Sequence, residues 1–220
     1  MKDKAEDYDF DKTRSLVEKG EFSKLPALTI EFFSQKDPNN KNLVSLAICC
    51  GQMDKLPEHL LTEELLLDKD NDGNTALHHA CSQYDLNFIP EKFLKKEYLK
   101  IGNHMGESVY HIAADYGQLN QIPISEFDEE VLLMADRSGH KVLNRVLCPE
   151  IRRDLPDFDQ SAIVLKYLKT KTIRENLERA QIRGPRNNDD NLDYEVLSAE
   201  LNKRVIKKAV KETPNEEIEL

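Results

Sequence analysis

An eight-residue motif recurs in this chain at a spacing of 33 residues. It is clearest at residues 73–80, Gly-Asn-Thr-Ala-Leu-His-His-Ala, and a near copy, Gly-Glu-Ser-Val-Tyr-His-Ile-Ala, occupies residues 106–113. A third and more divergent copy begins at Gly139. A period of about 20–50 residues is typical of stacked repeats, each of which buries its apolar surface against its neighbours. This period constrains the fold more than any local pattern does.

A second marker extends the count of repeats. An apolar residue followed by proline recurs every 33 residues, after a first interval of 31, at Leu25-Pro26, Leu56-Pro57, Ile89-Pro90, Ile122-Pro123 and Leu155-Pro156. The sequence therefore predicts about five 33-residue units, with the outer ones least regular, as capping repeats are.

Within a unit the pattern predicts a turn, a helix, a short return helix and a further helical turn. Asp70 to Gly73 favours a turn, and Thr75 should cap a helix that runs to about Gln83. Because proline lacks the N–H of an interior helical residue, the return helix should begin near residues 86–89 and be short. The further turn, with acids near its start, is expected at segments 29–33, 62–66, 96–99 and 128–132.

The charge is unevenly distributed. The net charge is −10, and residues 1–151 hold 17 Lys and Arg against 27 Asp and Glu, whereas residues 152–212 hold 14 against 11. This acidic balance disfavours duplex DNA or an anionic membrane as the main partner. We expect neither a nucleic-acid nor a membrane partner. We interpret the basic residues Lys203, Arg204, Lys207 and Lys208 as a solvated helix face. Alternatively, the segment 152–212, with its net charge of +3, docks on the acidic repeats.

The ends of the chain differ from the repeats in composition. The expected organisation is a flexible N-terminus (1–12), a repeat array (13–160), a capping helix (161–183), a linker (184–191), an amphipathic helix (192–212) and an acidic tail (213–220). The N-terminus lacks the basic start and apolar run of a signal peptide. We expect a cytoplasmic monomer, or an effector secreted without a classical signal peptide.

The motif Gly-x-Thr-x-Leu-His-x-Ala at this period resembles the ankyrin repeat. One unit matches at Asp70, Gly73, Thr75, Leu77, His78 and Ala80, and the next at Asn103, Gly106, Ser108, His111, Ala113, Ala114 and Gly117. Ala76 and Val109 replace the proline that is usual in the family, and the recurring Leu/Ile-Pro pair resembles a variant found in bacterial proteins. The resemblance implies an all-α, ankyrin-type helical-repeat solenoid with C-terminal capping helices.

The sequence contains candidate metal-binding and catalytic residues, but not the motifs that such sites require. His78, His79 and the four cysteines (Cys49, Cys50, Cys81 and Cys148) include no Cys-x-x-Cys pair at structural zinc spacing. The resemblance assigns His78 and His111 to structural hydrogen bonds. No nucleophile motif or glycine-rich phosphate loop is present, and the turn at Asp70 lacks the twelfth-position Glu of a calcium loop. We expect no metal, no cofactor and no enzymatic activity.

The resemblance also implies a binding surface made of turn tips and the inner side of each first helix. The positions carried over are Asn71, Asp72, Asn74, Ser82, Gln83, His104, Met105, Glu107, Asp115, Tyr116, Arg137, Ser138 and His140. Met105 and Tyr116 are the expected anchors, being adaptable and large respectively. The predicted function is a non-catalytic module that binds a protein partner. The alternatives are a regulatory or host-directed effector whose basic C-terminal helix is the active element, and a cryptic enzyme.

Overall fold

The computed structural model describes residues 10–83, 85–146, 172–173, 199–200 and 202–204. The chain divides into two compact units, the first made of residues 1–126 and 135–139 and the second of residues 127–134 and 140–220. The boundaries expected after residues 160, 183, 191 and 212 lie outside the described residues, and α1 begins before residue 13.

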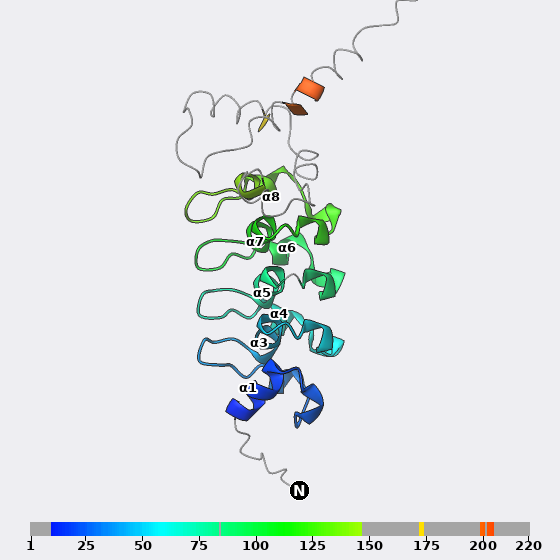
Figure 1. Ribbon diagram of the computed structural model, residues 1–220. Helices are drawn as coiled ribbons and strands as arrows, with labels where there is room; N and C mark the ends of the chain where they lie inside the picture. Colours follow the sequence, from blue (N-terminus) through cyan, green and yellow to red (C-terminus); the bar gives the residue numbers. More distant parts are fainter. Residues whose placement is uncertain (1–9, 84, 147–171, 174–198, 201, 205–220) are drawn as a thin grey trace, which may run out of the picture. The chain divides into compact units, whose positions relative to one another are not determined.

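The second and third repeats of the first unit share one arrangement (Figure 1): a loop, an inner α-helix, two 3₁₀ helices (labelled η) and a short α-helix. The first repeat has one 3₁₀ helix, and the short α-helix that follows the last pair of 3₁₀ helices belongs to the second unit. The inner helices are α1 (Phe10–Glu18), α3 (Leu43–Cys49), α5 (Ala76–Ser82) and α7 (Val109–Asp115). The 3₁₀ helices are η1 (Phe22–Lys24), η2 (Met53–Lys55), η3 (Glu58–Leu60), η4 (Leu86–Phe88), η5 (Glu91–Phe93), η6 (Leu119–Gln121) and η7 (Ile124–Glu126). The short α-helices are α2 (Ile30–Phe33), α4 (Glu63–Leu67) and α6 (Lys96–Leu99).

The inner helices form the core of the first unit. Helix α5 packs on α3 and on α7, and α3 packs on α1, so that each helix lies against its neighbours in the series. In α5 the side chains of Leu77, Ala80 and Cys81 are fully buried, as the sequence predicted. Small residues at positions 80 and 81 allow the helices to approach closely. The helical-repeat fold predicted from the period is confirmed.

The expected return helix is not one α-helix. After Leu56-Pro57 and Ile89-Pro90 the chain forms a second 3₁₀ helix, so each return segment is split in two. Ile89 is extended, with ψ 125°, because the ring of the following proline disfavours helical backbone in the preceding residue. The apolar face was nevertheless predicted correctly, since Leu86, Ile89, Phe93 and Leu94 are all buried.

The short helices occur where the further turns were predicted. Thr29 and Thr62 cap α2 and α4 by accepting hydrogen bonds from the N–H groups of Phe32 and Leu65. In the second unit, Asp128 caps α8 (Glu129–Leu133), which packs on α9 (Val142–Val146).

Residues 172–173, 199–200 and 202–204 are helical. Through the described ranges the structure is all-α, and no helix there is both long enough and apolar enough to cross a membrane.

Candidate protein-binding site

Each loop of the first unit ends in a tip that is shaped by one acidic or amide side chain. In the tip at residues 70–74, Asp70 Oδ1 accepts hydrogen bonds from the N–H groups of Asp72 (3.0 Å) and Asn74 (2.8 Å). Two residues spaced by 33 do the same in other tips, Asp37 and Asn103, and Asp136 Oδ1 accepts a hydrogen bond from Ser138 N–H. Gly73 has φ +77° in this turn, a backbone conformation that is strained for residues with a Cβ atom.

A series of backbone hydrogen bonds joins one tip to the next. Asn71 N–H donates to Asn39 O, His104 N–H to Asp72 O, and Arg137 N–H to Met105 O, each at 2.9 Å. We call this series the tip ladder. Because each bond uses main-chain atoms, the ladder fixes the spacing of the tips whatever side chains they carry. The tips therefore present variable side chains on a defined scaffold.

Buried histidines link the tips to the inner helices. His78 Nδ1 accepts a hydrogen bond from Thr75 N–H (3.2 Å), and His78 Nε2 lies 3.0 Å from Glu107 O in the next loop. Burial lowers the pKa of His78 to about 4, so the ring is neutral and donates through Nε2 at neutral pH. His111 Nδ1 accepts in the same way from Ser108 N–H at 3.1 Å. His78 therefore holds successive repeats together.

The second histidine of the motif has a different partner. His79 Nε2 lies 2.8 Å from Asp70 Oδ2, the carboxylate that shapes the tip. Burial lowers the pKa of His79, and the hydrogen bond to Asp70 opposes that shift. The pair connects the inner helix α5 to its own tip. Both histidines that first suggest an active site thus have structural partners.

The predicted site residues lie at the tips and at the ends of the inner helices. The exposed ones are Asn71, Asp72, Gln83, His104, Met105, Tyr116, Arg137 and Ser138, and the half-buried ones are Asn74, Ser82, Glu107, Asp115 and His140. His140 belongs to the second unit, so its position relative to the others is not described. Met105 and Tyr116 are 58% and 38% exposed and are among the large apolar side chains that the described residues leave exposed, together with Phe88 and Ile124.

Some predicted site residues also have structural roles. Asn103 Nδ2 donates to Asn74 Oδ1 (3.0 Å) and to Glu107 Oε2 (3.1 Å), which ties neighbouring tips together. Ser82 Oγ donates to the carbonyl of His79 within its own helix. The prediction omitted the first tip, residues 38–41, although the ladder includes it and the 33-residue period points to it.

The cysteines are poorly suited to thiolate chemistry. Burial raises the pKa of Cys49 to about 11 and raises the pKa of Cys81 further, so both thiols stay protonated at neutral pH. Cys148 lies outside the described residues. No group of three His, Cys, Asp or Glu side chains in the described part of the chain is arranged to hold a metal ion.

Comparison with known proteins supports the fold. No protein-family model matches the sequence, and no curated protein matches it. A solved structure does, that of the predatory endopeptidase Bd0816 from Bdellovibrio bacteriovorus in complex with the immunity protein Bd3460, an ankyrin-repeat protein. The match has a TM-score of 0.51 and 17% identity, and it covers 91% of this chain and 97% of the matched chain. The fold is that of the ankyrin repeat. At this identity the likeness describes the fold and carries no activity with it.

Proposed function

We propose that this chain is a non-catalytic module that binds a protein partner through its tips and the neighbouring ends of its inner helices. The observation that carries the proposal is the exposure of Met105 in a tip of the ladder and of Tyr116 at the end of α7, on a scaffold whose tips are joined by main-chain hydrogen bonds. A scaffold that does not rearrange loses little entropy on binding. Large exposed apolar side chains on such a scaffold are typical anchors of protein interfaces.

A more specific candidate is inhibition of an enzyme by this binding. The chain shares its fold with the partner of an endopeptidase in the solved complex. A tip surface that covers an active-site cleft would block substrate without any catalytic residue of its own. This version predicts that the captured partner is a hydrolase and that the chain lowers its activity at equimolar concentration.

The test is affinity capture from the source cell with the full-length protein, followed by mass spectrometry and a binding measurement on the partner identified. Met105→Ala with Tyr116→Ala should weaken that binding by about 2 kcal/mol or more. The control is Phe88→Ala with Ile124→Ala, which removes the two large exposed apolar side chains that lie away from the tips. Equal binding by both double variants would contradict the proposal.

The rival proposal, an effector that acts through residues 192–212, makes a different prediction. A fragment of residues 1–183 would then lose the activity while keeping its repeats. In our proposal the same fragment keeps the partner. Most of residues 192–212 lie outside the described part of the chain, although Arg204 Nε pairs with Glu200 Oε1 at 2.7 Å, one helical turn apart.

A further inference from the structure

The 3₁₀ helices of the first unit lie on the side away from the tips, which we call the outer edge (Figure 1). We call the contact between two successive repeats a joint. At two of the three joints, a side chain on the outer edge bonds to the backbone of the neighbouring repeat. At the first joint, His59 Nε2 lies 2.8 Å from Leu28 O. At the third joint, the Glu126 carboxylate accepts a hydrogen bond of 2.6 Å from Lys96 N–H. In both cases a side chain of the later repeat holds the earlier repeat.

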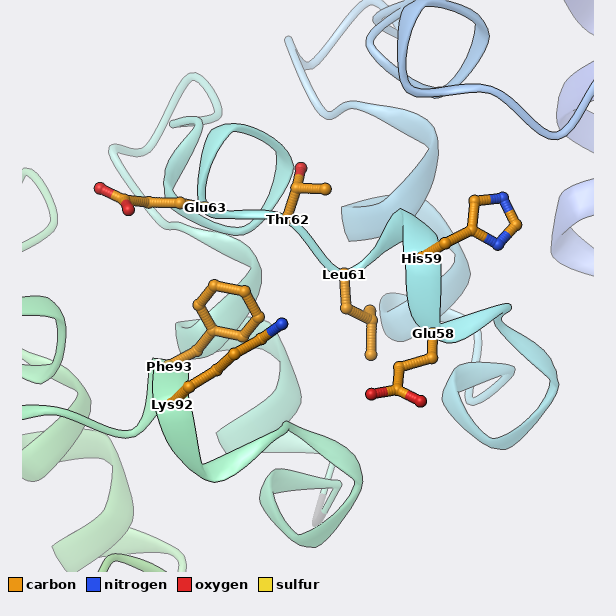
Figure 2. Close-up of a pocket in the computed structure, with 7 residues that line it drawn as sticks. All are labelled: Glu58, His59, Leu61, Thr62, Glu63, Lys92 and Phe93. Atoms are coloured by element: carbon orange, nitrogen blue, oxygen red, sulfur yellow. The ribbon is translucent and has the colours of Figure 1, made fainter.

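The second joint is arranged differently. Lys92 stands 33 residues after His59 and belongs to the equivalent 3₁₀ helix. Its ammonium group lies over the ring of Phe93, 4.9 Å from the ring centroid, and not against the backbone of the earlier repeat. A groove of about 630 Å³ lies at this joint, between η3, the start of α4 and η5. Figure 2 shows Lys92 and Phe93 facing Leu61 across it.

A second hollow lies at the first joint, where Ser34 and Lys36 face α4. It has a volume of about 650 Å³ and shares Glu63 with the first. We call the two together the edge groove. Leu61 and Phe93 form an apolar floor and are 6% and 7% exposed. The Tyr98 hydroxyl donates to Glu63 Oε2 at 3.0 Å, which orients that carboxylate.

Acidic side chains outnumber basic ones around the edge groove. Four carboxylates line it, those of Glu58, Glu63, Glu64 and Asp68, against the two ammonium groups of Lys36 and Lys92. Lys36 is paired with Asp68 at 2.7 Å, so it does not neutralise the other three carboxylates. Beside the apolar floor itself, the two carboxylates of Glu58 and Glu63 face the one ammonium group of Lys92, so the charge there is negative.

We propose that the edge groove is a second docking surface, which binds an extended basic segment of a protein partner with alternating basic and apolar side chains. The charge complementarity selects the basic side chains, because arginine donates two parallel hydrogen bonds to a carboxylate. The apolar floor receives the aliphatic stems and the alternate apolar residues. An arginine can also replace the ammonium of Lys92 over the face of Phe93. This surface is separate from the tips and does not depend on their function.

The test uses the full-length protein and two fluorescent synthetic hexapeptides, one of alternating Arg and Leu and one of alternating Glu and Leu. Fluorescence anisotropy should show binding of the basic peptide, weakened by added salt, and at least about tenfold weaker binding of the acidic one. Glu58→Gln with Glu63→Gln should reduce affinity for the basic peptide by about tenfold.

Two matched variants separate the groove from general charge attraction and from the tips. Glu91→Gln with Glu97→Gln removes the same number of exposed carboxylates from the next repeat and should leave affinity for the basic peptide within about twofold. Met105→Ala with Tyr116→Ala should also leave it unchanged. The proposal is overturned if the basic peptide does not bind, or if the two glutamine double variants weaken it equally.

Discussion

On the tip side of the first unit, three successive joints use the same bond, a backbone N–H donating to a backbone carbonyl at 2.9 Å. On the outer edge, the first joint uses a histidine bonded to a carbonyl, the second a tyrosine hydroxyl bonded to a carboxylate, and the third a glutamate bonded to a backbone N–H. Main-chain bonds repeat because every residue supplies the same groups, whereas side-chain bonds change with each substitution. The two sides of one repeat therefore differ in what they allow: a fixed spacing at the tips and an individual joint at the edge.

The largest difference between the two sides is expected at their histidines. His78→Ala should lower the free energy of unfolding by about 4 kcal/mol, because it leaves the buried Thr75 N–H and Glu107 carbonyl without their partner and opens a cavity. His59→Ala, at an exposed position on the edge, should cost less than about 1 kcal/mol. Urea unfolding of both variants measures this, and equal losses would contradict the comparison.

A pH dependence should follow from the same buried ring. The pKa of His78 is lowered from 6.5 to about 4, so between these values the unfolded chain binds a proton that the folded chain does not. Stability should therefore be complete above pH 6.5 and fall by about 3 kcal/mol as the pH drops to 4. His79 has its pKa lowered as well and contributes in the same direction.

The measurement is urea unfolding at several pH values between these limits. The control is His78→Asn, an amide that does not titrate and that keeps an acceptor and a donor. Its stability should fall less steeply over the same range. If the stability of His78→Asn fell with pH as steeply as that of the natural chain, groups other than His78 would cause the pH dependence.

Two glycines with positive φ, Gly73 and Gly51, should show a smaller difference in stability when each is replaced by alanine. A Cβ on Gly73 would lie 2.8 Å from the backbone nitrogen of His104 in the next tip, so Gly73→Ala should cost about 2–3 kcal/mol from strain in both the turn and the ladder. Gly51 has φ +66° at the end of α3, and a Cβ there meets nothing within 4 Å. Gly51→Ala should cost about 1 kcal/mol from the backbone alone. Thermal unfolding of the two variants distinguishes steric from conformational strain.

Much of the repeat could be predicted from the sequence because its signals are local. Thr75 marks the start of α5, which ends at Ser82, one residue before the expected Gln83, and the threonine caps mark α2 and α4. The return helix was predicted wrongly because proline was considered for its own missing N–H and not for its effect on Ile89.

The two candidate sites differ in how much of them could be predicted from the sequence. The tip residues follow from the period and the family resemblance, and their role in binding stays a prediction. The edge groove could not be predicted, because it depends on whether Lys92 turns onto Phe93 or toward the preceding repeat, and the period carries no information on that choice.

The smallest predicted effect on stability tests why the edge groove is open. Lys92 and Leu61 are separated by 31 residues, as are His59 and Leu28, whose side chain and carbonyl are bonded at the first joint. A ring at position 92 should therefore reach the Leu61 carbonyl. Lys92→His exchanges a cation–π contact for one hydrogen bond, so stability should change by less than about 0.5 kcal/mol.

The same variant should reduce binding of the basic peptide by about fivefold, because the ring occupies the space between Leu61 and Phe93. Lys92→Ala is its control: it removes a positive charge and leaves the groove empty, so it should strengthen binding of the basic peptide. If both variants changed affinity in the same direction, the lysine would act through its charge alone, and the difference between the second joint and its neighbours would have no part in binding.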